Sequence, residues 1–104
     1  AAAVLFQTVD FVLSPTTPVT SFPAEWASPL NDPARPFEHI VYTVPWNMSE
    51  QPAISLNCGF TSAGMPIGLQ IVGPRFDDLG TLSLAKAYED CRGPITTWPR
   101  PPVA

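Results

Sequence analysis

The sequence predicts an α/β fold, and three features lead to that prediction. Two short apolar runs, at residues 9–13 and 67–72, have the length and the β-branched residues of buried strands. A run at 52–58 alternates apolar and polar side chains, which is typical of a strand with one covered face. A longer segment from Asp77 has apolar residues at three-residue steps and stops at Gly93, which is typical of a helix. We therefore expect about three strands and a closing helix.

The length and the charge of the chain limit what it can be. It has 104 residues, with 5 Lys and Arg against 9 Asp and Glu, so its formal net charge is −4. That length allows one domain at most. The acidic balance argues against a partner that is nucleic acid, because a phosphate-binding protein carries a basic face. No apolar stretch reaches the ~18 residues of a membrane helix, so no membrane partner is predicted.

The composition indicates a piece of something larger. Charged residues make up 13% of the chain, against ~25% in ordinary globular proteins. Hydrophobic residues make up 45%, which excludes an intrinsically disordered chain, because disorder needs the reverse balance. With so few charges to cover its surface, the chain is expected to be covered in part by further protein.

The first half of the chain is predicted to hold a helix end, one strand, a long loop and a short helix. The first predicted strand stops where Pro15 begins a proline-rich stretch. Six prolines lie among residues 15–36, and each lacks a backbone donor and restricts the residue before it. Residues 15–37 are therefore predicted to form a proline-rich loop. Residues 38–48 have the apolar spacing of a short helix, which Pro45 is expected to kink or end.

The second half is predicted to hold a hairpin, a helix and a tail. A segment rich in turn formers joins the strands at 52–58 and 67–72, so an antiparallel connection is expected. Asp77 is placed to cap the following helix, because its carboxylate can accept a hydrogen bond from a first-turn N–H group. The helix carries an apolar stripe made of Leu79, Leu82, Ala85 and Tyr88. Residues 94–104 are predicted to be an extended tail.

The reactive side chains form no catalytic or metal-binding set that is visible in the sequence. Cys58 lies in a predicted strand, so a free buried thiol is expected rather than a disulfide with Cys91. The single histidine, His39, is expected at the surface or hydrogen-bonded, and no metal site or cofactor is predicted. Ser83 and Lys86 have the S-x-x-K spacing of some serine acyltransferases, but the companion motifs are missing, so both are expected to be solvated.

Several motifs occur in a fixed order between Tyr42 and Glu89. They are Thr43, Pro45 and Asn47, then Pro52-Ala53-Ile54-Ser55, Cys58-Gly59-Phe60, the glycine- and proline-containing run Gly64–Gly73, Phe76-Asp77, and Ala87-Tyr88-Glu89. In this order and spacing they closely resemble the C-terminal part of the amidase signature family. Upstream, residues 10–18 resemble the strand of that family that runs into a Pro-Thr turn. The similarity is far more specific than any single short motif.

The resemblance implies an α/β/α sandwich with a mixed central sheet, of which residues 1–104 would be a single C-terminal fragment. Members of the family hydrolyse a carbon–nitrogen amide bond with a nucleophilic serine, a bridging serine in a cis peptide and a lysine. A glycine-rich loop stabilises the oxyanion through backbone N–H groups. In the family these groups lie well upstream, and nothing in residues 1–104 matches them. We therefore expect no catalytic residue here, and no activity of the chain by itself.

The resemblance also suggests where the substrate would lie. Family members that release ammonia from glutamine tend to carry an acidic residue at the position of Ile40. Because Ile40 is apolar, a general amidase is the main prediction. A glutamyl-tRNA amidotransferase A-type subunit is the alternative. Ile40 and Trp46 are the predicted substrate-pocket residues for a small amide. A second alternative is a free-standing, non-catalytic module that binds a partner with the same scaffold; a start codon directly before Ala1 would favour it.

The resemblance further implies that the main partner is the remainder of an amidase chain. Strands that are interior in a complete sheet become edges in a fragment, and open edges pair with other chains. The isolated fragment is therefore expected to self-associate or to be loosely folded. The N-terminus has no basic region of the kind that opens a signal peptide, so a cytoplasmic location is expected.

Overall fold

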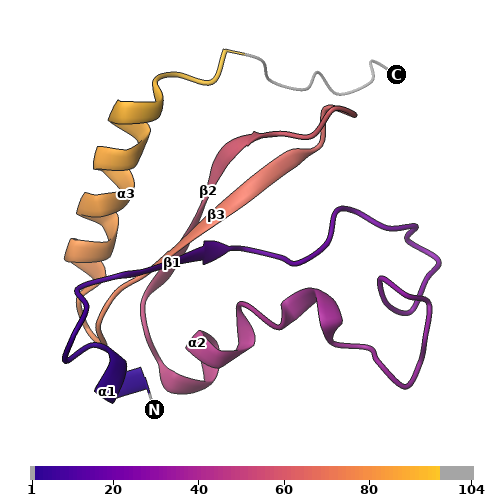
Figure 1. Ribbon diagram of the computed structural model, residues 1–104, viewed down its shortest axis with the longest axis horizontal. Helices are drawn as coiled ribbons and strands as arrows, with labels where there is room; N and C mark the ends of the chain where they lie inside the picture. Colours follow the sequence, from indigo (N-terminus) through magenta and orange to yellow (C-terminus); the bar gives the residue numbers. More distant parts are fainter. Residues whose placement is uncertain (1, 97–104) are drawn as a thin grey trace, which may run out of the picture.

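A computed structural model describes residues 2–96, which form a small sheet with one long helix beside it (Figure 1). The sheet has three antiparallel strands in the order β1-β3-β2, and α3 packs against β2 and β3. In chain order the elements are α1 (Ala2–Leu5), β1 (Val12–Pro15), the 3₁₀ helix η1 (Glu38–Ile40), α2 (Val44–Ser49), β2 (Ala53–Phe60), β3 (Pro66–Val72) and α3 (Asp78–Arg92). The predicted α/β class, with three strands and a C-terminal helix, is confirmed.

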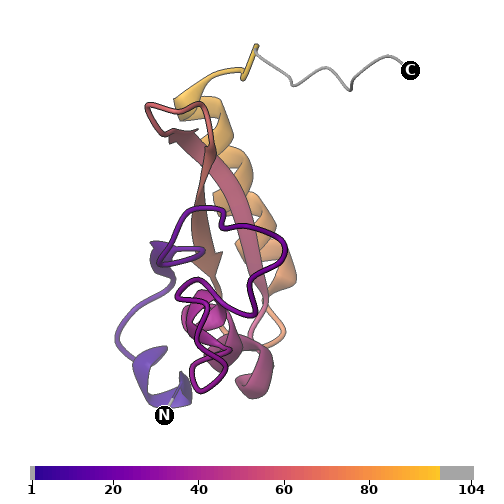
Figure 2. The ribbon, with the colours of Figure 1, turned by 90° about the vertical axis from the view of Figure 1, so that its right-hand side faces the viewer.

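The two layers are seen from the side in Figure 2. There α3 and the two long strands run together along the height of the molecule, and η1 and α2 gather at its lower end. Residues 16–37, which connect β1 to η1, contain turns and bends but no helix or strand. The predicted tail at 94–104 lies largely outside the described residues, which end at 96.

The first strand begins later than predicted and includes a proline. It covers Val12–Pro15 rather than residues 9–13, and Pro15 stands opposite Leu69 of β3. Within residues 2–96, β1 pairs with β3 alone and therefore lies at an edge of the sheet. An edge strand tolerates proline because the missing N–H can fall on the side without a neighbouring strand.

The predicted helix at 38–48 is in fact two short pieces, and Pro45 has the opposite effect to the one expected. η1 ends at Ile40, and α2 begins at Val44 with Pro45 in its first turn. A first-turn residue has no intrahelical acceptor for its N–H, so proline is favourable there, with its φ already near the helical value. The prediction that Pro45 kinks or ends a helix was therefore wrong, because the proline starts one.

The predicted hairpin is confirmed, but its free thiol is exposed rather than buried. β2 and β3 pair in register from Ala53 and Val72, and the register shifts at a β-bulge between Asn57 and Gly59. Cys58 stands at this bulge with its Sγ 3.4 Å from the carbonyl oxygen of Ile67. Because a bulge turns a residue out of the regular alternation, Cys58 reaches the surface. Both cysteines, Cys58 and Cys91, are free, as expected.

The helix α3 begins as predicted, but only part of its predicted apolar stripe faces the sheet. The carboxylate of Asp77 accepts a hydrogen bond from the backbone N–H of Gly80, at 3.0 Å. Thr81 and Ala85 are the buried residues of the helix, whereas Leu79 and Leu82 are 77% and 55% exposed. Of the predicted apolar stripe, Ala85 lies on the contact side of the helix, whereas Leu79 and Leu82 do not.

A close approach between backbone and helix explains which side of α3 is buried. A Cβ atom on Gly73 would lie 2.2 Å from the Oγ1 atom of Thr81. Only small residues fit where the helix comes this near to the end of β3. Thr81 and Ala85 fit, and the bulky leucines are turned away.

The buried core is small for a chain of this size. Three apolar side chains are buried among the described residues: Ile71, Val72 and Ala85. The accessible surface is 7581 Å², whereas a compact monomer of this mass exposes about 5,700 Å². The radius of gyration is 16.0 Å, against about 13 Å for a compact domain of this length. The fold therefore leaves apolar surface uncovered.

Within residues 2–96, none of the helices combines the length and the apolar content that crossing a bilayer requires.

Candidate functional site

The two predicted pocket residues lie on the two short helical pieces before the hairpin. Ile40 is the last residue of η1 and is half-buried. Its carbonyl oxygen accepts hydrogen bonds from the backbone N–H and the Oγ1 hydroxyl of Thr43, at 3.0 and 3.1 Å. Trp46 lies in the first half of α2 and is also half-buried. The ring of Phe6 meets the Trp46 ring edge-on, with the ring centres 6.4 Å apart.

Two depressions in the surface border α2 and its C-terminal end. One has a volume of about 380 Å³ and is lined by α1 and the following Phe6, by the end of α2 with Gln51, and by the β3–α3 connection with Arg75. The other has a volume of about 400 Å³ and lies between the start of β2 and the first turns of α3. Neither lining includes Ile40 or Trp46, so their assignment to a pocket stays a prediction.

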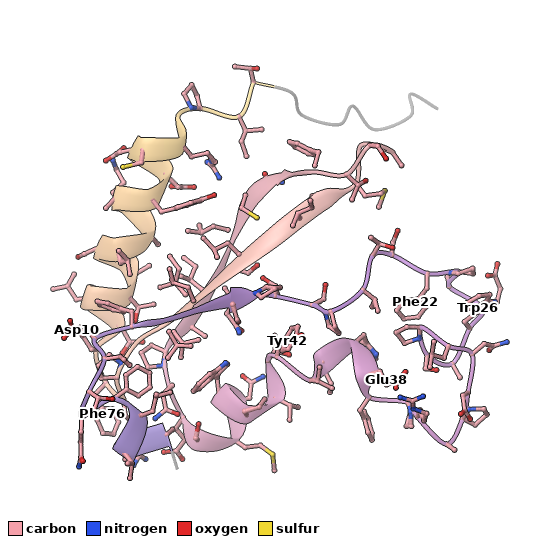
Figure 3. The ribbon with its side chains drawn as sticks, viewed as in Figure 1. Asp10, Phe22, Trp26, Glu38, Tyr42 and Phe76 are labelled. Atoms are coloured by element: carbon pink, nitrogen blue, oxygen red, sulfur yellow. The ribbon has the colours of Figure 1, made fainter. Side chains whose placement is uncertain are left out.

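The best-defined polar site lies on the sheet face next to these helical pieces. Gln70 of β3 is 3% exposed. Its Nε2 donates to the Oγ hydroxyl of Ser14 on β1, at 3.0 Å, and to the carbonyl oxygen of Tyr42, at 2.8 Å. Tyr42 lies on the stretch between η1 and α2, next to β1 (Figure 3). A single buried carboxamide therefore joins two strands to the segment that carries Ile40 and Trp46.

A second polar contact lies one step further along the same face. The hydroxyl oxygens of Thr16 and Ser55 are 2.6 Å apart, although they come from opposite sides of β3. They meet above Gly68, where a Cβ atom would lie 2.6 Å from Thr16 Oγ1 and 3.0 Å from Ser55 Oγ. The missing side chain of Gly68 therefore leaves the space that this hydroxyl pair fills.

Sequence reasoning missed this polar face, although a signal for it was present. Gln70 is the one polar residue in the otherwise apolar run at 67–72, and its side chain ends in a carboxamide. The strand register sets Ser14 and Ser55 opposite it on the two neighbouring strands. A buried carboxamide must find hydrogen-bond partners, so a polar residue in such a run predicts polar neighbours on the same face.

The other reactive residues do not assemble into a catalytic set within the described chain. Ser83 donates its hydroxyl to the carbonyl oxygen of Leu79 at 2.7 Å, and Lys86 pairs with Asp90 on the exposed side of α3. His39 differs from expectation: it is half-buried beside Phe22, and its Nδ1 is buried with no partner among the described residues. Among residues 2–96, no three His, Cys, Asp or Glu side chains are grouped as metal ligands would be.

Comparison with known proteins gives a family. The model of the family described as Amidase matches residues 1–82. The A-type subunit of the glutamyl-tRNA(Gln) amidotransferase of Myxococcus xanthus is 46% identical over 84 residues, which is 81% of this chain and 17% of that protein. Its counterpart from Thermodesulfovibrio yellowstonii is 43% identical over the same length and the same shares.

A solved structure agrees with these sequence matches. The 6-aminohexanoate cyclic dimer hydrolase is similar over 86% of this chain and 20% of its own, with a TM-score of 0.66 and 29% sequence identity. The chain therefore spans about a fifth of the length of the relatives that it matches. Because the family match covers most of the sequence, with its motifs in order, the chain belongs to the amidase family.

Proposed function

We propose that this chain is the C-terminal portion of an amidase signature serine amidohydrolase, an enzyme that hydrolyses a carbon–nitrogen amide bond to an acid and ammonia or an amine. The observation that carries the proposal is the family match over residues 1–82 of a chain that spans only 17% of its relative from Myxococcus xanthus. On this proposal, the nucleophilic serine, the bridging serine and the lysine of the family lie in other polypeptide of the complete enzyme.

The exposed apolar surface supports the proposal that another part of the same polypeptide packs against this chain. Phe76, at the turn into α3, is 81% exposed, and Leu79 and Leu82 on the outer side of that helix are 77% and 55% exposed. A helix with apolar residues on two sides is typical of a buried position. The remainder of the amidase chain is the partner that would cover these residues.

The role proposed for residues 1–104 is support for a reaction centre rather than chemistry. The sheet would hold the η1–α2 segment at the edge of a pocket for a small amide, with Ile40 and Trp46 bordering the acyl or amine group. No cofactor is needed for the serine chemistry of the family. Two free cysteines fit a reducing, cytoplasmic compartment.

A second candidate is the C-terminal part of a glutamyl-tRNA amidotransferase A-type subunit. The observation in its favour is that the relatives with 46% and 43% identity carry that description. The acidic residue that glutamine-handling members tend to have is absent, because that position is Ile40. The two candidates differ in their substrate, which is glutamine in one case and a general linear amide in the other.

The test compares the complete protein that contains this chain with residues 1–104 alone. We expect the complete protein to hydrolyse short linear amides and residues 1–104 to be inactive. If the complete protein releases ammonia from glutamine and does not hydrolyse other amides, the second candidate is favoured. Amide turnover by residues 1–104 alone would overturn the proposal, and so would a coding sequence that begins at Ala1 and adds no further domain.

The pocket assignment has a separate test in the complete enzyme. Trp46→Leu is expected to change the ratio of kcat/KM between a small and a bulky amide by about tenfold, as pocket substitutions do. Met48→Ala serves as the control, because Met48 lies on the same helix and is 82% exposed. Unchanged ratios in Trp46→Leu would remove Trp46 from the pocket.

A further inference from the structure

The segment that carries Ile40 and Trp46 has few attachments to the sheet. Within the described residues, one side-chain hydrogen bond joins residues 17–49 to a strand, and it runs from Gln70 Nε2 to the carbonyl oxygen of Tyr42, at 2.8 Å. The aromatic contact of α2 runs from Trp46 to Phe6, the residue after α1, and not to the sheet. Gln70 is therefore the one strand residue with a side-chain hydrogen bond to this part of the described chain, while Glu50 just after α2 pairs with Arg75 of the β3–α3 connection.

The local hydrogen bonds explain why Tyr42 is the point of attachment. The carbonyl oxygen of Ile40 is taken by Thr43, through its backbone N–H and its hydroxyl. The carbonyl oxygen of Thr43 accepts from the first turn of α2, including the N–H of Trp46 at 3.2 Å. Tyr42 stands between these two, and its carbonyl oxygen is used by the sheet rather than by either helical piece.

The side chain of Gln70 is itself held in place, so it can hold the carbonyl oxygen of Tyr42 in position. The residue is 3% exposed, and the same Nε2 also donates to Ser14 Oγ on β1, at 3.0 Å. Both contacts use donors, which a carboxamide has and a carboxylate or an apolar side chain of equal length lacks. Because β3 is the central strand of the described sheet, the amide sits on the most constrained part of the fold.

From this geometry we propose that Gln70 is a positioning residue, which fixes the stretch Tyr42–Ser49 over the sheet and thereby sets where Ile40 and Trp46 lie. The consequence for substrate selection rests on the proposed amidase function. The claim that Gln70 holds this segment in place does not rest on that function. It requires only that the segment becomes more mobile when the carboxamide is removed. Neither part requires Gln70 to touch a substrate.

The experiment uses the complete protein with Gln70→Met, which keeps the length of the side chain and removes both donors. Amide hydrogen exchange is measured over 42–51 and over β2 and β3. We expect exchange over 42–51 to rise by about tenfold or more, because the Tyr42 carbonyl loses its donor from the sheet, while the strands exchange as before. We also expect the ratio of kcat/KM between a small and a bulky amide to shift about fivefold or more, mainly through KM.

Two further variants make the result specific. Ser14→Ala leaves the bond to Tyr42 in place, so its exchange over 42–51 is expected to stay near that of the unsubstituted protein. Gln7→Met makes the same substitution at an exposed glutamine and is expected to change nothing.

The outcomes separate the inference from the function on which it partly rests. Exchange that is unchanged over 42–51, or that rises equally over 42–51 and the strands, would overturn the positioning role. Faster exchange with an unchanged ratio of kcat/KM between the two amides would overturn the link to substrate selectivity. If the complete protein turns over no amide, the proposed function fails, and the exchange measurement alone decides whether Gln70 fixes the segment.

Discussion

At the scale of single residues, the polar face of the sheet depends on which side chains are absent as much as on which are present. Thr16 and Ser55 reach across β3 and meet with their hydroxyl oxygens 2.6 Å apart, because Gly68 between them has no side chain. Gln70, two residues further along the same strand, fills its own place completely and is 3% exposed. On this face, Gly68 leaves space for a hydroxyl pair, and Gln70 supplies a carboxamide that donates hydrogen bonds.

Gly68→Ala is expected to lower the free energy of unfolding of the complete protein by about 1–3 kcal/mol, as overpacking does. The new methyl group would lie 2.6 Å from Thr16 Oγ1, closer than a real Cβ contact permits, so the hydroxyl pair must separate. Chemical denaturation measures the change. Thr16→Ala removes the obstructing hydroxyl, so the double variant should lose less than the sum of the single losses. Additive losses would show that the space above Gly68 is not filled by this pair.

Residue types alone predicted part of this face and not the rest. The alternation of Ile54 and Leu56 with polar neighbours indicated a strand with two different faces, and the structure confirms that strand. The exposure of Cys58 was not predictable from alternation, because a bulge between Asn57 and Gly59 shifts the register by one residue. The partners of Gln70 come from residues 28 and 56 positions away in the sequence, which no local pattern contains.

At the scale of elements, α3 shows how packing distance can override apolar periodicity. The sequence places leucines at 79 and 82 on one stripe, yet the helix buries Thr81 and Ala85 against the sheet. A long apolar side chain needs more space between helix and sheet than the approach to Gly73 leaves. Hydrophobic periodicity predicted the helix, Asp77 and Gly93 predicted its ends, and the size of the residues decides which side packs against the sheet.

Ala85→Leu should therefore destabilise the protein, although leucine is the more hydrophobic residue. Ala85 is 4% exposed, so the added atoms would push α3 away from the sheet, and the expected loss is about 1–3 kcal/mol in the free energy of unfolding. Ala87→Leu is the matched control on the exposed side of the same helix and should stay within about 0.5 kcal/mol. Equal effects in thermal unfolding would contradict the orientation of α3 described above.

At the scale of the whole molecule, the small core and the open sheet belong together. Three buried apolar side chains are few for a chain with 45% hydrophobic residues, and both outer strands pair on one side only within residues 2–96. The low charge content by itself indicated covered surface. The partner that we propose to cover it, the remainder of the amidase chain, follows from the family motifs and not from composition, because low charge alone does not specify a partner.

Residues 1–104 prepared alone should self-associate. The side of β1 that has no neighbour in the described sheet offers unpaired backbone groups, and Leu13 on that strand is 60% exposed, a combination that favours strand pairing with a second copy. Sedimentation velocity is expected to show dimers or larger species whose proportion rises with concentration.

Leu13→Lys should shift the population towards the monomer, because a charge on an edge strand opposes pairing. Val4→Lys changes an equally exposed side chain on α1, away from the edge, and should leave the distribution as it was. If the unsubstituted chain sediments as a compact monomer at every concentration, the open edge attracts no second copy. An equal response to both lysines would mean that added charge alone, and not the edge of β1, controls the association.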